Sequence, residues 1–128
     1  MSTARPRTAA SWHLPPGKSA PAHSRELAAA TLSEWGLDAI ADDTVLLIDE
    51  LVTNAVLHAP GPIQLTLHLD ESALLCQVTD SNSCPPLPRV PGPHTESGRG
   101  LHLLHTLAST HGWSLTPTGK VVWFTHTT

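Results

Sequence analysis

Three polar residues recur one helical turn apart in the segment that ends at residue 58: Glu50, Asn54 and His58. In an α-helix, spacings of i, i+4 and i+8 place such residues on one face, beside the apolar stripe of the same segment. A carboxylate one turn before an amide puts a proton acceptor next to an oxygen ligand, and a hard cation such as Mg²⁺ prefers a few oxygens completed by water and phosphate. A solvated polar helix face is the alternative interpretation.

A single carboxylate, Asp80, ends a strand-like segment and precedes the irregular run Ser81-Asn82-Ser83. A carboxylate in this place can accept a hydrogen bond from an exocyclic amine while it rejects a carbonyl. Aspartate also hydrogen-bonds its own backbone in turns, so a structural turn residue is the alternative.

A pair of glycines lies at a predicted helix start, in Gly98-Arg99-Gly100-Leu101. Glycines let the backbone approach an anion closely, and the free N–H groups of a helix N-terminus favour phosphate. The segment lacks the Lys-Ser/Thr pair of a P-loop and does not closely follow a strand, which excludes the Walker and Rossmann motifs. Arg99 either reaches a terminal phosphate or stays solvated.

The elements that must position these residues follow from hydrophobic periodicity. The predicted elements are a strand at 11–14, helices at 21–35 and from 38 or 42 to 58, strands at 63–69 and 73–79, a proline-rich loop at 81–98, a helix from 98 to about 111–112, and strands at 113–117 and 121–126. Hairpin strands grouped apart from helices predict an α+β fold, built as a two-layer α/β sandwich. We expect residues 1–10 to be a disordered tail and residues 11–128 to be a single domain.

The composition argues against several classes of function. The chain has 128 residues, with 7 Lys plus Arg against 11 Asp plus Glu, and a formal net charge of -4. Because no electropositive field is available to hold a phosphate backbone, direct nucleic-acid binding is not expected. No segment approaches the roughly 18 to 20 apolar residues of a membrane-spanning helix. The two cysteines and nine histidines show no metal-ligand spacing, and we expect a cytoplasmic protein.

Taken together and in this order, the motifs resemble those of a known family. The run ELVTNAVLH at 50–58 looks like the N-box of the GHKL (Bergerat-fold) ATPases, and it is most similar to that of the anti-sigma factor serine kinases. The run VTDS at 78–81 resembles their G1 box, SGRGL at 97–101 their G2 box, and GKVVWF at 119–124 their closing strand. The resemblance spans roughly residues 11 to 127.

The resemblance implies a mostly antiparallel mixed sheet covered by helices on one face, with ATP held between the helices under a mobile lid. Asn54 would coordinate Mg²⁺ bridging the phosphates, and Glu50 would be the general base that activates the attacking hydroxyl. Asp80 would accept a hydrogen bond from the adenine amino group, and Gly98 and Gly100 would line the phosphate end of the lid. The remaining residues of the implied ATP-binding set are His58, Arg99 and Leu101.

The resemblance also implies a function in bacterial transcription control. Such a protein would be a cytoplasmic homodimer that binds a sigma factor and phosphorylates an anti-sigma factor antagonist of the STAS type on serine or threonine. Two positions depart from the family pattern: Asn82 stands where glycine is usual, and Val121 stands where a threonine hydroxyl commonly supports the adenine-binding network. These departures leave open the alternative of a non-catalytic module that sequesters a partner with weak or no ATP binding.

Overall fold

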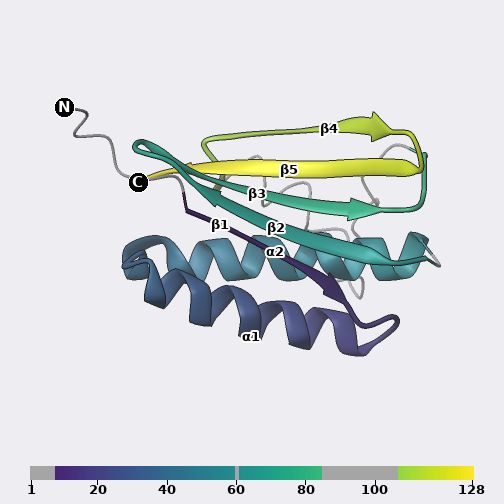
Figure 1. The fold of residues 1–128 in the computed structure, drawn as a ribbon, viewed down its shortest axis with the longest axis horizontal. Helices are drawn as coiled ribbons and strands as arrows, with labels where there is room; N and C mark the ends of the chain where they lie inside the picture. The colour runs from purple at the N-terminus through teal and green to yellow at the C-terminus, as the bar shows by residue number, and fades with distance from the viewer. Residues whose placement is uncertain (1–7, 60, 85–106) are drawn as a thin grey trace, which may run out of the picture.

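The computed structural model describes residues 8–59, 61–84 and 107–128. In chain order the described elements are β1 (Thr8–Leu14), α1 (Ser19–Glu34), α2 (Asp38–His58), β2 (Ile63–Leu69), β3 (Ala73–Asp80), β4 (Thr110–Thr116) and β5 (Gly119–Thr127), shown in Figure 1. None of the helices in these ranges is long and apolar enough to cross a membrane.

The described strands form one sheet in the order β1-β2-β3-β5-β4. Every neighbouring pair is antiparallel. The β2–β3 connection is closed by Asp70, whose Oδ1 accepts the backbone N–H groups of Ser72 at 2.8 Å and Ala73 at 2.9 Å, as short polar side chains do in tight turns. Because β5 lies between β3 and β4, the C-terminal strand brings residues near position 120 against the end of β3.

Both helices pack on the same side of the sheet, α2 directly beneath it and α1 alongside (Figure 1). The helix α1 ends at Glu34, and Gly36 in the turn that follows takes a φ of +72°, a conformation that glycine adopts at little cost. The N–H of Gly36 then bonds the carbonyl of Ser33, and the N–H of Leu37 bonds that of Leu32, so the chain reverses and begins α2.

The core lies between this helix layer and the inner face of the sheet. Alternate residues of each central strand point inward, because side chains in a strand have a period of two. The fully buried inner-face side chains of the central strands include Leu65, Leu67, Leu74, Cys76 and Phe124, and those of α2 include Leu47, Ile48 and Val52. At about 25 cal/mol per Å² of apolar surface, this burial is the main stabilising contribution to the fold.

The predicted α+β class and two-layer arrangement are confirmed, with corrections at the ends of elements. The strand β1 begins at Thr8, so residues 8–10 pair with β2 rather than forming part of a tail. The strand β4 begins at Thr110, so His111 and Gly112 lie in a strand, not at the end of the predicted third helix. The rest of the predicted loop after residue 84 and most of that helix lie outside the described residues.

Candidate functional site

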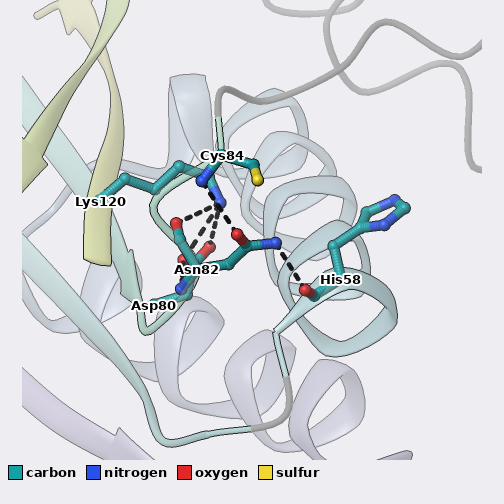
Figure 2. A network of polar contacts seen from close by, with 5 residues as sticks. All are labelled: His58, Asp80, Asn82, Cys84 and Lys120. Atoms are coloured by element: carbon teal, nitrogen blue, oxygen red, sulfur yellow. Dashed lines mark hydrogen bonds and ion pairs between the residues drawn. The ribbon is translucent and has the colours of Figure 1, made fainter. Parts of the chain in front are cut away.

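Two opposite charges are buried together where β3 and β5 lie side by side. Asp80 is the last residue of β3, and the strand register places it opposite Lys120 of β5. The Nζ atom of Lys120 lies 2.9 Å from Oδ2 and 3.1 Å from Oδ1 of Asp80 (Figure 2). The side chains are 6% and 2% exposed, respectively. A buried charge needs an opposite charge nearby, and Asp80 and Lys120 serve as counter-charges for each other.

The alternation of β3 and β5 explains why these two charges point inward. Asp80 continues the inner-face series Leu74, Cys76 and Val78, and Lys120 continues the series that contains Val122 and Phe124. The pair therefore closes the end of the apolar core. Gly119 permits the close approach of the two strands, because a Cβ at this position would overlap the carbonyl oxygen of Asp80.

Asn82 connects this ion pair to the end of α2. Its backbone N–H donates to Asp80 Oδ1 at 2.8 Å, and its carbonyl oxygen accepts from Lys120 Nζ at 3.1 Å. Its side-chain Nδ2 donates to the carbonyl oxygen of His58 at 2.7 Å, while its Oδ1 accepts from the N–H of Cys84 at 2.9 Å. Figure 2 shows the Asn82 side chain lying between the Asp80–Lys120 pair and the last turn of α2. Within residues 81–84, the side chain of Asn82 thus links the loop after β3 to α2.

On α2, the three polar residues singled out by their spacing lie at the border of the buried stripe. Glu50 and Asn54 are half-buried, and His58 is exposed at the helix end. The Oδ1 atom of Asn54 is buried without a hydrogen-bond partner within the described part of the chain. A buried amide oxygen without a partner costs on the order of 1–3 kcal/mol, and a bound cation is one group that satisfies it.

The whole arrangement falls inside one family match. The chain matches the profile of the histidine kinase-like ATPase domain over residues 17–126. It belongs to this family. A comparison with curated proteins finds no match.

Membership of the histidine kinase-like ATPase family supports ATP binding, and the described residues fit this ligand at two places. The unpartnered Asn54 oxygen suits a hard cation held together with phosphates. A carboxylate has about four acceptor positions, and described residues take three of those of Asp80: Asn82 N–H and Lys120 at Oδ1, and Lys120 again at Oδ2. No described residue takes the remaining position, on Oδ2.

For this ATPase domain, the structure changes the significance of both departures from the family pattern. Asn82 needs no glycine-like backbone, because no non-glycine residue in the described ranges has a positive φ. Val121 pairs with Thr79 and Ser114 and points to the sheet face away from the helices, so it does not face Asp80. The residue of β5 that faces Asp80 is Lys120. The alternation of Lys120 with the apolar Val122 and Phe124 is the sequence signal that would have identified it.

The structure therefore brings Asp80 and the backbone of His58 together through Asn82, and it places Glu50 and Asn54 on the same helix as His58. His58 contributes its carbonyl oxygen to this network. The predicted phosphate-binding residues Gly98, Arg99, Gly100 and Leu101 lie outside the described residues.

A cavity of about 410 Å³ opens at the same end of the sheet. It is lined by residues of β1, β2 and β3 and of the turns beside them, namely His13, Pro62, Ile63, Gln64, Thr79, Asp80, Ser81 and Thr118. No residue of α2 contributes to this lining.

Proposed function

We propose that this histidine kinase-like ATPase domain binds ATP with Mg²⁺ and transfers the γ-phosphoryl group to a serine or threonine of an anti-sigma factor antagonist of the STAS type. In its other state it binds a sigma factor, and it acts in a bacterial cytoplasm. The observation that carries the proposal is the buried, unpartnered Oδ1 of Asn54, one helical turn after Glu50 and within the family match.

The roles of the residues follow from their chemistry. Asn54 Oδ1 would hold Mg²⁺, which supplies charge neutralisation at the phosphates when bound. Glu50 would take the proton from the serine or threonine hydroxyl that attacks. The hydroxyl oxygen would form a bond to the γ-phosphorus while the bond from that phosphorus to the bridging oxygen breaks, and ADP leaves. Asp80 would accept one N–H of the adenine amino group at the open position on Oδ2.

The first test is titration of the wild-type chain with ATP and ADP, with and without Mg²⁺, by calorimetry. We expect Mg²⁺-dependent ATP binding that Asn54→Ala lowers at least tenfold, since a charge-assisted contact contributes about 1.5–3 kcal/mol. Gln77→Ala is the matched control, because this amide lies on the sheet face away from the helices. Equal ATP affinity in Asn54→Ala and Gln77→Ala would contradict the proposed cation site.

The second test separates binding from chemistry. Glu50→Gln should retain ATP affinity and lose phosphoserine formation on the antagonist by about 10²- to 10⁴-fold, the usual contribution of a general base. Glu26→Gln, an exposed carboxylate change on α1, should leave both properties unchanged. A Glu50→Gln chain that phosphorylates at the wild-type rate would remove Glu50 from the mechanism.

One observation favours the second candidate function, a non-catalytic module that sequesters a partner. Lys120 and Asn82 occupy most acceptor positions of Asp80, whose side chain is 2% exposed. If these contacts close the base site, millimolar nucleotide should give no heat and no thermal stabilisation of the wild-type chain. The same titration therefore distinguishes the two candidates.

We also propose that the domain forms a homodimer through the sheet edge at β1 together with α1. In the sheet formed by the described residues β1 is an edge strand, and an edge strand offers backbone groups for pairing with another chain. Sedimentation should then give about twice the 13.6 kDa of one chain, and a mass of one chain at high concentration would contradict the dimer.

A further inference from the structure

The ammonium group of Lys120 is held by Asp80 and Asn82. It donates to Oδ1 of Asp80 and to the carbonyl oxygen of Asn82, and it also lies 2.9 Å from Oδ2 of Asp80. The residue is 5% exposed. Because both partners belong to the network around Asp80, Lys120 influences a ligand of Asp80 by holding that carboxylate in place.

The effect on Asp80 is to fix one carboxylate orientation. Among the described residues, Oδ1 is contacted by both the Asn82 N–H and Lys120, while Oδ2 is contacted by Lys120 alone. The two oxygens are thus not equivalent, and rotation of the carboxylate would break contacts on both sides. The acceptor position that remains lies on Oδ2.

We propose that Lys120 is the positioning residue that determines the purine preference of the nucleotide site. By holding Asp80 charge-paired and with a single acceptor position open, it makes the site accept the amino group at position 6 of adenine and repel the carbonyl at the same position of guanine. This inference rests on the proposed ATP binding and adds a determinant of base selectivity to it.

The physical basis is the difference between an oriented and an unoriented carboxylate. An acceptor that is fixed in place gives directional discrimination, because a carbonyl presented to it finds no donor and is left unpaired. The ion pair with Lys120 also prevents the Asp80 carboxylate from rotating toward other partners. Without Lys120, the carboxylate can turn away from the base, and adenine loses its advantage.

The test is the ratio of ATP to GTP affinity in the full chain with Mg²⁺, measured by calorimetry. The chain has two lysines, so Lys18→Met, at the exposed cap before α1, is the matched control for Lys120→Met. We expect the wild type and Lys18→Met to prefer ATP by at least about tenfold, and Lys120→Met to lose most of that preference through weaker ATP binding.

The ratio is chosen because a merely structural role of Lys120 would lower both affinities equally and leave the ratio unchanged. Lys120→Gln is the second variant, since it keeps N–H donors on a shorter side chain without the charge, and we expect an intermediate ratio. If Lys120→Met does not fold, Lys120→Gln decides the outcome.

The outcomes separate this inference from the function on which it rests. A wild-type chain that binds neither nucleotide overturns both. A wild-type chain that binds ATP and GTP equally, or a Lys120 variant that keeps the wild-type ratio within twofold, overturns the role of Lys120 and leaves ATP binding intact. Loss of the preference in the Lys120 variants alone supports the inference.

Discussion

Replacing Lys120 by methionine tests how much the buried ion pair contributes to folding. The substitution removes the ammonium group that lies 2.9–3.1 Å from both Asp80 carboxylate oxygens and the Asn82 carbonyl oxygen. It leaves the carboxylate, whose side chain is 2% exposed, with no counter-charge among the described residues. Removing one partner of a buried pair costs about 3–5 kcal/mol, because the remaining charge stays desolvated. We expect Lys120→Met to lower the free energy of unfolding by about this amount, a large part of the 5–15 kcal/mol typical of a domain.

The assay is urea unfolding followed by circular dichroism. With an m-value of about 2 kcal/mol/M, the loss corresponds to a midpoint lower by about 1.5–2.5 M. The double variant D80N/K120M removes both charges and keeps an oxygen for the Asn82 N–H. Since an uncharged pair avoids the desolvation cost, we expect this variant to be within about 2 kcal/mol of the wild type and more stable than Lys120→Met.

The control is the ion pair between Arg25 and Asp49, in which the two atoms are 2.7 Å apart but the side chains are 49% and 25% exposed. Arg25→Met should cost less than about 1 kcal/mol, because solvent screens the pair. If Lys120→Met is no more destabilising than Arg25→Met, or if the double variant is less stable than Lys120→Met, the argument from burial is refuted.

Three further predictions concern other parts of the fold. Gly119→Ala should lower the free energy of unfolding by at least about 1–3 kcal/mol in the same assay, because its Cβ would meet the Asp80 carbonyl, and an unchanged midpoint would contradict the close contact. Burial lowers the pKa of His126, although Asp43 opposes this shift. The folded state therefore binds fewer protons at His126 than the unfolded state does. This contribution to stability is complete above the unfolded-state pKa of about 6.5 and declines as the pH falls below it. When unfolding is measured at pH 7.5 and at pH 5.5, the free energy of unfolding should decline less in His126→Gln than in the wild type. Burial raises the pKa of the Cys76 thiol well above its usual value, whereas Cys84 is exposed. A thiol reagent should therefore label one cysteine per native chain and two in urea. The native Cys84→Ser variant should not react with the reagent.

Much of the fold and part of the site can be predicted from the local pattern of the chain. Periodicity of 3.6 residues defines α2, and alternation defines β2, β3 and β5, because each element must bury one face and the spacing of apolar residues records which face. The same logic places Glu50 and Asn54 one turn apart on a helix, and Asp80 at a strand end. These relations depend only on the geometry of a single element.

The sequence by itself therefore determined the class of the fold, the family and the residue types of the site. Only the tertiary structure showed that Lys120, forty positions after Asp80, supplies its counter-charge, and that Asn82 ties the pair to the end of α2. Pairing of β3 with β5 is a long-range event, and the register that sets Asp80 opposite Lys120 rather than Val121 follows from which face of each strand the core buries. The register cannot be read from the local sequence pattern of either strand. It is determined when β3 and β5, which are far apart in the chain, pack on the same helix layer.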